Sequence, residues 1–213
     1  MAILGIMRHG PCKELTKGTL TGWNDIPLTE CGKREIEITS MLLRRFDWKK
    51  IYTSKLVRSI ESANIAGDIL NISHVPRISH AALNDRNWGI WTNKSAASIE
   101  QKLGKHGLSR IKKSFDHPIQ GGETRRETYS RVSEYCKKVI FPDLQKVGCI
   151  LIVNHSCSLR PIMGLVENLS EKQAYDLEFG TSEAVIYEID ENGKMISKAE
   201  IRKKKFEVMK IVG

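Results

Sequence analysis

The sequence lacks most features that are typical of membrane-bound proteins, secreted proteins or proteins stabilised by a structural metal ion. No apolar run approaches the ~20 residues that a bilayer span requires, and the opening segment MAILGIMRHG has no basic region followed by a long apolar core, as a signal peptide would. The five cysteines are odd in number and form no Cys-x-x-Cys pair, which argues against a disulfide framework and a zinc site. We therefore expect a cytoplasmic protein without a membrane partner.

Aromatic residues are also scarce, at 7% of the chain, although the formal net charge is +9. The basic residues are scattered, apart from the run 202–205, and they are not interleaved with stacking aromatics as in nucleic-acid binders. This composition predicts no nucleic-acid partner. The charge fits either a solvated surface or the attraction of a small, multiply charged anion. The basic run, together with Lys198, is expected either to cover the mouth of a site or to be a solvated terminus.

Short apolar runs alternate with helical patterns along the chain. Segments 3–7 and 149–153 are continuously apolar, as central strands of a parallel sheet are, and 51–53 and 185–189 are weaker strand candidates. The alternation of strand and helix predicts an α/β fold, a three-layer α/β/α sandwich with a mostly parallel central sheet.

Three helices are expected between these strands. One begins after the capping residue Thr29, with Ile36, Met41 and Leu42 on its apolar face, and the others cover 56–70 and 124–140. The length of 213 residues suits a single domain over 1–213. Segment 84–122 is polar, glycine-punctuated and only patchily helical, and we expect it to be an insertion at the C-terminal edge of the sheet, where α/β folds bind ligands.

Two histidines follow the two most apolar strands. Arg8-His9-Gly10 comes directly after segment 3–7, and Asn154-His155-Ser156 directly after segment 149–153. Parallel strands end at the same edge of a sheet, so His9 and His155 should lie close together. The turn that begins at Ser54 is expected to place Arg58 on the same rim.

These residue types suit phosphoryl transfer. A neutral imidazole nitrogen of His9 can attack phosphorus, and the forked guanidinium groups of Arg8 and Arg58 can hold the phosphoryl oxygens. The imidazole of His155 and amides at a helix N-terminus complete a clamp for the developing charge. Such a clamp requires no metal ion.

Several motifs along the chain resemble those of one enzyme family. The segments RHG, TGWNDIPLTECG, SKLVRS, LNDRNWG, NK and NHSCSLR are similar to those of cofactor-dependent phosphoglycerate mutases, in the histidine phosphatase superfamily. The similarity runs from about residue 3 to residue 200, and the close spacing of KKSFDHP and GGET matches the short form. The resemblance implies the mutase fold, 2,3-bisphosphoglycerate as phosphoryl primer, no metal, and a small phosphorylated carboxylic acid as substrate. It also implies a place in glycolysis and gluconeogenesis, and it leaves a homo-oligomer open.

The resemblance assigns roles residue by residue. It implies that His9 is the phosphorylated histidine and that Asp85 takes the place of the family's proton-transferring glutamate. The phosphate clamp is then formed by Arg8, Arg58, His155 and Ser156. The implied substrate-binding residues are Thr21, Gly22, Arg86, Trp88, Lys94, Lys112 and Lys113.

The chain departs from the family pattern at several of these positions. Asp85 is one methylene shorter than glutamate, and Trp88 stands for a tyrosine. Lys112 and Lys113 replace two arginines that hold the substrate carboxylate, and lysine cannot form the same two-point contact. Further departures are Leu15 for asparagine, Cys12 for serine, and Ser156-Cys157 for Gly-Asn.

Three functions are consistent with this pattern. The first is interconversion of 2- and 3-phosphoglycerate through phosphohistidine. The second is a phosphomonoester phosphatase that uses the same His9 and water, which the lost arginines and the doublet Gly121-Gly122 favour. The third is a catalytically impaired homologue that binds phosphorylated ligands.

Overall fold

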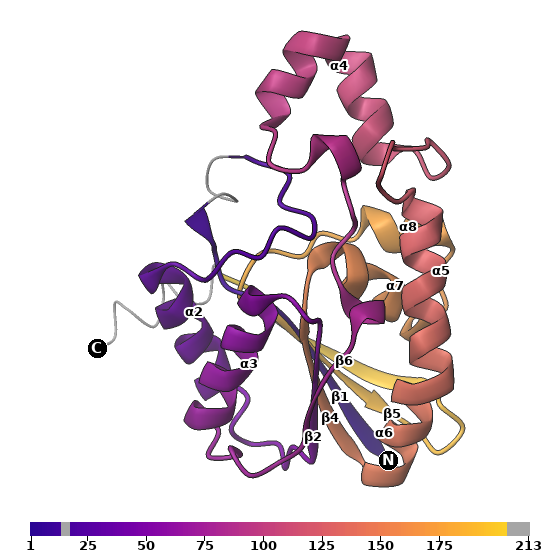
Figure 1. Ribbon diagram of the computed structural model, residues 1–213. Helices are drawn as coiled ribbons and strands as arrows, with labels where there is room; N and C mark the ends of the chain where they lie inside the picture. The colour runs from indigo at the N-terminus through magenta and orange to yellow at the C-terminus, as the bar shows by residue number, and fades with distance from the viewer. Residues whose placement is uncertain (14–17, 204–213) are drawn as a thin grey trace.

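A six-stranded sheet forms the centre of the fold (Figure 1), and the computed structural model describes residues 1–13 and 18–203. The strands are β1 (Ala2–Arg8), β2 (Lys50–Thr53), β3 (Arg77–Ser79), β4 (Cys149–Asn154), β5 (Ala184–Ile189) and β6 (Met195–Ile201). They are ordered β3-β2-β4-β1-β5-β6, with β3, β2, β4 and β1 parallel and β5 and β6 antiparallel to their neighbours. The predicted mostly parallel α/β sheet is confirmed.

Helices cover both faces of the sheet. The longer ones are α2 (Glu30–Met41), α3 (Val57–Ile69), α4 (Ala96–Lys113), α5 (Arg125–Tyr135), α6 (Phe141–Val147), α7 (Ser156–Val166) and α8 (Glu171–Asp176). Short turns of helix are η1 (Ala81–Leu83), η2 (Gly89–Trp91) and the π-helical η3 (Cys136–Ile140), which continues α5 into α6. Figure 1 shows α2 and α3 on one side of the sheet and α5, α6 and α7 on the other, so the structure is the predicted three-layer sandwich.

Successive side chains of each strand point to opposite faces of the sheet, so each face has its own hydrophobic core. In β4, Ile150 and Ile152 pack with α5, α6 and α7, whereas Leu151 and Val153 pack with α2 and α3. The continuous apolar sequence of this strand therefore reflects burial on both sides.

Helix α2 begins as expected but packs differently at its end. Thr29 caps it, because its Oγ1 accepts the Gly32 N–H at 2.9 Å, and Ile36 is fully buried. Met41 is 46% exposed, so its assignment to the apolar face was wrong. The helix ends at Met41 and the chain turns, which lets Leu43 enter the core in its place.

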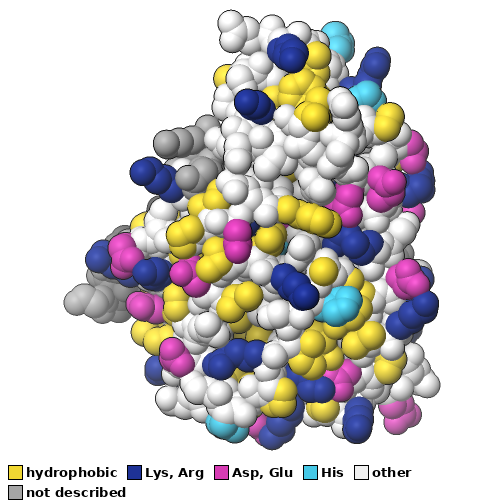
Figure 2. All heavy atoms as spheres, viewed as in Figure 1, with side chains coloured by type: hydrophobic (Ala, Val, Ile, Leu, Met, Phe, Trp, Pro, Cys, Tyr) yellow, Lys and Arg dark blue, Asp and Glu magenta, His cyan; other side chains and the backbone are white. Residues whose placement is uncertain are grey.

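Segment 84–122 rises above the carboxyl ends of the parallel strands (Figure 1). It is more regular than expected, because α4 runs for 18 residues and is interrupted only at Gly104, whose φ is 72°. The helix contributes Ile99 and Ile111 to a third, smaller hydrophobic core, which also contains Leu20, Trp88 and Ile119. On the face shown in Figure 2, lysine and arginine side chains are scattered among acidic ones. Within 1–13 and 18–203, no helix is long and apolar enough to span a bilayer.

Candidate active site

The pairing of β1 with β4 brings two histidines together. The strands are parallel and in register from Ile3 and Cys149 to Arg8 and Asn154, and the His9 N–H continues the ladder by donating to Asn154 O at 2.9 Å. The rings of His9 and His155 lie 5.0 Å apart with an interplanar angle of 59°. Both side chains are almost completely buried, at 1% and 0% exposure.

The hydrogen bond of His9 determines which ring nitrogen is reactive. Nδ1 lies 2.8 Å from Gly10 O, and because a carbonyl oxygen only accepts, Nδ1 carries the proton. Burial, and then the charges of Arg58 and Arg8, hold the pKa of His9 well below 6.5. His9 is therefore neutral near pH 7, and Nε2 keeps a free lone pair.

His155 is oriented by a residue that the sequence reasoning did not assign. Ser54, directly after β2, places its Oγ 2.7 Å from His155 Nε2 and accepts the Leu56 N–H at 3.1 Å. The Ser54 hydrogen can then point to Nε2, which leaves the ring proton on Nδ1. Burial and the neighbouring Arg58 lower the pKa of His155 well below 6.5, so this ring is neutral too.

Two arginines flank the histidines, and both are held by main-chain carbonyls. Arg8 Nη1 donates to Phe179 O at 2.8 Å. Arg58, fully buried, donates from Nη1 to Asn24 O at 2.9 Å and from Nη2 to Gly22 O at 2.8 Å. These contacts fix the guanidinium groups while other donors stay unused.

Three donors of the predicted phosphate clamp are buried without a hydrogen-bond acceptor among the described residues. They are Nε of Arg8, Nε of Arg58 and Nδ1 of His155. Each such donor costs about 1–3 kcal/mol when it stays unpaired. Guanidinium and imidazole N–H groups are donors suited to phosphoryl oxygens, so the chemistry of this donor set fits a phosphoryl group.

Asp85 reaches this group of donors despite its short side chain. Its Oδ2 lies 3.2 Å from Arg58 Nη2 and 4.0 Å from His155 Nδ1, and its Oδ1 accepts the Arg86 N–H at 2.9 Å. The main-chain oxygen of Asp85 accepts from Trp23 Nε1 at 2.6 Å and from Arg131 Nη2 at 3.3 Å. The carboxyl group is thus positioned at the clamp by contacts from three separate segments.

A cavity of about 240 Å³ opens from Arg8 and Asp85 toward the solvent. Five other residues assigned from the sequence line it: Thr21, Arg86, Trp88, Lys112 and Ser156. Seven assigned side chains therefore meet at one cavity, with His9, Arg58 and His155 buried beside it.

Three residues assigned to substrate binding do not line the cavity. Lys94 and Lys113 are exposed elsewhere, and Gly22 contributes its carbonyl to Arg58 instead. Gly22 has a φ of 52°, and a Cβ atom there would lie 3.0 Å from Trp88 Cδ1. Glycine therefore allows both the turn and the close packing on Trp88.

The sequence reasoning missed two arginines that line the cavity, Arg125 and Arg160. Arg160 lies four residues after Ser156 on α7, and this helical spacing was a usable signal because it puts both on one face. Arg125 follows the GGET segment at the start of α5, and no pattern in the sequence distinguished it from Arg126. Cys157, Thr19 and Leu20 complete the lining. Burial raises the pKa of Cys157, so its thiol stays protonated.

The basic residues near the C-terminus pair with acidic residues that do not line the cavity. Lys198 contacts Glu167 at 3.0 Å, Arg202 contacts Glu183 at 2.7 Å and Lys203 contacts Glu35 at 2.8 Å. The remaining basic residues of the run, Lys204 and Lys205, lie outside the described residues, as does Leu15. Over the described ranges, no three His, Cys, Asp or Glu side chains are grouped as metal ligands.

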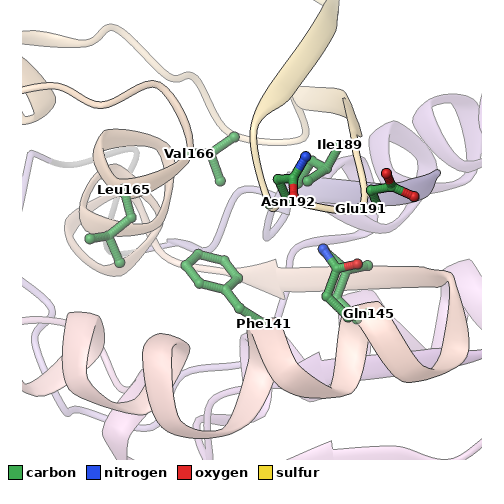
Figure 3. A pocket seen from close by; sticks show the side chains of 9 residues that line it. Phe141, Gln145, Leu165, Val166, Ile189, Glu191 and Asn192 are labelled. Atoms are coloured by element: carbon green, nitrogen blue, oxygen red, sulfur yellow. The ribbon is translucent and has the colours of Figure 1, made fainter.

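A second cavity, of about 210 Å³, lies at the opposite end of the sheet between α6, α7 and the β5–β6 turn (Figure 3). Its walls are mostly apolar, with Phe141, Leu165 and Val166 among them, and Glu191 is its one charged lining residue. Among the described residues, its lining includes no histidine, cysteine, lysine or arginine.

Comparison with known proteins agrees with this geometry. Residues 4–201 match the Histidine phosphatase superfamily (branch 1). A protein of Cytophaga hutchinsonii named 2,3-bisphosphoglycerate-dependent phosphoglycerate mutase is 34% identical over 190 residues, 88% of each chain. Bacillus stearothermophilus YhfR superposes with a TM-score of 0.79 at 23% identity, over 92% of this chain and 94% of that one. The alpha-ribazole phosphatase of Shigella flexneri does so with 0.77 at 20% identity, over 88% and 91%. The resemblance stated from the motifs is confirmed, and the chain belongs to the histidine phosphatase superfamily, branch 1.

Proposed function

We propose that the protein transfers phosphoryl groups through a phosphohistidine on His9 and that it interconverts 2- and 3-phosphoglycerate. The observation that carries the proposal is the neutral His9, whose Nε2 is free, beside three unpaired buried donors of Arg8, Arg58 and His155. The relative from Cytophaga hutchinsonii, named as such a mutase, supports the choice of substrate. The same assignment places the reaction in glycolysis and gluconeogenesis, in the cytoplasm.

The first half-reaction forms a P–N bond and breaks a P–O bond. The lone pair of His9 Nε2 attacks phosphorus, and the departing oxygen takes a proton from the carboxylic acid of Asp85. Arg8, Arg58 and His155 donate hydrogen bonds to the phosphoryl oxygens as charge develops on them. Main-chain contacts hold both arginines in advance, so little reorganisation is needed during the reaction.

The second half-reaction reverses these roles. The carboxylate of Asp85 removes the proton of an acceptor hydroxyl, whose oxygen attacks the phosphorus on His9, and Nε2 leaves with its electron pair. In a mutase the acceptor is a monophosphoglycerate hydroxyl, and the phosphate on the neighbouring carbon is then returned to His9. When bound, 2,3-bisphosphoglycerate supplies the phosphoryl group that loads His9.

A phosphatase is the second candidate, and the position of Lys113 favours it. Only Lys112 of the expected carboxylate-binding pair lines the cavity, and a single lysine recognises a carboxylate without the two-point geometry of arginine. The same His9 would then pass its phosphoryl group to water, with Asp85 as the base. A binding-only homologue is less well supported, because Asp85 reaches the clamp at 3.2 Å.

The test is to assay the purified protein with 3-phosphoglycerate, with and without 2,3-bisphosphoglycerate, beside an aryl phosphate. A mutase forms 2-phosphoglycerate in a primer-dependent way, whereas a phosphatase releases inorganic phosphate. Both produce an acid-labile, base-stable label that is lost in His9→Ala and kept in the exposed control His74→Ala. A label that persists in His9→Ala would place the nucleophile elsewhere.

A further inference from the structure

Segment 177–183, which connects α8 to β5, is contacted by three arginines at three successive main-chain carbonyl groups. The contacts, each of 2.8 Å, are Arg160 Nε to Leu177 O, Arg202 Nη1 to Glu178 O and Arg8 Nη1 to Phe179 O. Arg8 and Arg160 line the active-site cavity, whereas Arg202 directly follows β6 and is not among the described residues that line it. The position of this segment therefore affects two arginines of the cavity, and Arg202 reaches the segment from outside the cavity.

The same segment also contacts the turn that carries the nucleophile. The Ser182 N–H donates to Arg8 O at 3.1 Å and to His9 O at 3.3 Å, and Glu183 O accepts the Arg8 N–H at 3.0 Å. Ser182 is fully buried and has a φ of 59°, in the left-handed region that residues other than glycine rarely adopt. Such a conformation persists only where surrounding contacts enforce it, and Thr39 Oγ1 provides one by donating to Ser182 O. The segment is thus held in a strained conformation against the main chain of His9.

Arg202 joins the two ends of segment 177–183. Besides its contact with Glu178 O, its Nη1 lies 2.7 Å from the carboxylate of Glu183, which also accepts the Gly180 N–H at 2.8 Å. Its guanidinium carbon lies 5.7 Å from the centre of the Phe179 ring. The side chains of Arg202 and Glu183 are 30% and 13% exposed, so their ion pair is screened by salt less than a fully exposed pair.

We propose that Arg202 is a positioning residue for the phosphate clamp and that it acts through segment 177–183 to hold Arg8 and the turn at His9 in place. This inference rests on the proposed function. It also gives Arg202 a different role from the two expected for the basic run, a cover over the site and a solvated terminus. Loss of the Arg202 side chain would remove no donor from the clamp, so its effect must pass through Phe179 O and the Ser182 N–H.

The variants are Arg202→Gln, Glu183→Gln and the two combined. Lys198→Gln is the matched control, because Lys198 is a cation of β6 that is 25% exposed and pairs with Glu167 and Glu200, which lie outside segment 177–183. Arg202→Lys is added because it keeps a positive charge beside Glu183 if the glutamine variant folds poorly.

Three measurements are made on each variant at one ionic strength. Titration calorimetry with inorganic phosphate reports binding at the clamp and does not depend on turnover. The first-turnover release of the phenol from a saturating aryl phosphate reports the rate at which His9 is phosphorylated. Urea unfolding reports the loss of stability, which separates a positioning role from a structural one.

Arg202→Gln should weaken phosphate binding about 3- to 10-fold and slow the phosphorylation of His9 about 10- to 100-fold, because a displacement of about 1 Å at a reacting site can cost about 100-fold in rate. Glu183→Gln should have a similar effect, and the combined variant should be no worse than Arg202→Gln, since both changes remove the same contact. Arg202→Lys should lie between the parent protein and Arg202→Gln. Lys198→Gln should change binding and rate by less than about twofold.

Three results would overturn the positioning role. If Arg202→Gln lowers the urea midpoint but changes neither phosphate binding nor the phosphorylation rate, Arg202 is a structural residue only. Equal losses in Lys198→Gln would mean that the general field of one positive charge is responsible, and additive losses in the combined variant would mean that Arg202 does not act through Glu183. If Arg202→Gln does not fold, parent-like binding and rates in both Arg202→Lys and Glu183→Gln would contradict the proposal.

The proposed function fails by a different observation. If the parent protein binds phosphate but His9 is never labelled, the phosphohistidine mechanism is wrong, and the effect of Arg202→Gln on phosphate binding still tests the positioning role. If His9 is labelled equally fast in the parent protein and in Arg202→Gln, with equal phosphate affinity, only the positioning role is wrong.

Discussion

Replacement of Asp85 by asparagine removes the proposed proton donor with very little change in shape. The amide can keep the 2.9 Å contact with the Arg86 N–H, and the main-chain contacts to Trp23 and Arg131 are unaffected. The departing oxygen would lose its proton source, and general acid–base catalysis contributes about 10²- to 10⁴-fold in rate. We therefore expect kcat to fall by about 10²- to 10⁴-fold.

The same substitution should not weaken phosphate binding. The Asp85 carboxylate lies 3.2 Å from Arg58 Nη2 and therefore competes with a phosphate for this guanidinium. At an effective dielectric constant of about 20, two unit charges at this separation interact by roughly 5 kcal/mol, an upper bound before solvation is counted. Arg58 keeps its bonds to Gly22 O and Asn24 O, so we expect a loss of stability of only about 1–3 kcal/mol.

Three measurements check this prediction together. Steady-state kinetics should show the loss in kcat, product inhibition should show phosphate affinity unchanged or higher, and urea unfolding should show the modest loss of stability. Asp85→Glu restores the acid with a longer reach and should keep activity or increase it. If Asp85→Asn retains full activity on every phosphate ester tested, Asp85 is a turn residue and the proton comes from another group.

Three further predictions concern the histidines and the clamp. Folding lowers the pKa of His9 and His155 well below 6.5, so the unfolded chain takes up protons that the folded chain does not. Stability should therefore be full above about pH 6.5 and fall as the pH is lowered toward about 5. Urea midpoints that do not vary over this range, or a slope unchanged in His9→Gln, would contradict it. Ser54→Ala removes the hydroxyl that lies 2.7 Å from His155 Nε2. This variant should lower kcat at least about tenfold and reduce the free energy of unfolding by about 1–3 kcal/mol. Ser54→Thr keeps the hydroxyl and should keep most of the activity. Treatment with a chelator should leave the rate of His9 labelling unchanged, because the proposed clamp consists of guanidinium and imidazole donors. A loss of labelling that is restored by added metal ions would refute the clamp.

The sequence was sufficient for the strands β1, β2, β4 and β5 and for the meeting of the histidines, whereas β3 and β6 were not predicted. Strands buried on both faces are continuously apolar, so β1 and β4 could be located within a residue of their ends. Parallel strands share an edge, so the residues after them had to converge, and His9 and His155 do so at 5.0 Å. Both inferences depend on local patterns and on one rule of topology.

The rest of the cavity depends on tertiary contacts that a single sequence does not reveal. Arg125 and Arg126 are adjacent and identical in type, and both lie 5.9 Å from the Phe115 ring. Only Arg125 also stacks on Tyr175, at 4.7 Å, whereas Arg126 pairs with Asp116 on the surface. Helix α4 likewise gains its order from a small core that joins Leu20 to residues about 70 to 100 positions later, while its own composition reads as polar. Lys113 follows Lys112 by one position, so a helix must direct the two to different faces.

In the proposed mechanism, the positive charges of Arg8 and Arg58 have two effects: they keep the nucleophile His9 neutral, and they stabilise the phosphoryl group that it receives. An imidazole must be neutral to attack phosphorus, and burial together with Arg8 and Arg58 keeps the pKa of His9 below the neutral range. The same two arginines each have a buried Nε–H group without an acceptor among the described residues. In the proposed reaction the phosphoryl group moves to Nε2, where its oxygens would accept those hydrogens and its charge would offset that of the guanidinium groups. In the proposed mechanism, the positive charge that disfavours protonation of the free histidine would therefore also stabilise its phosphorylated form.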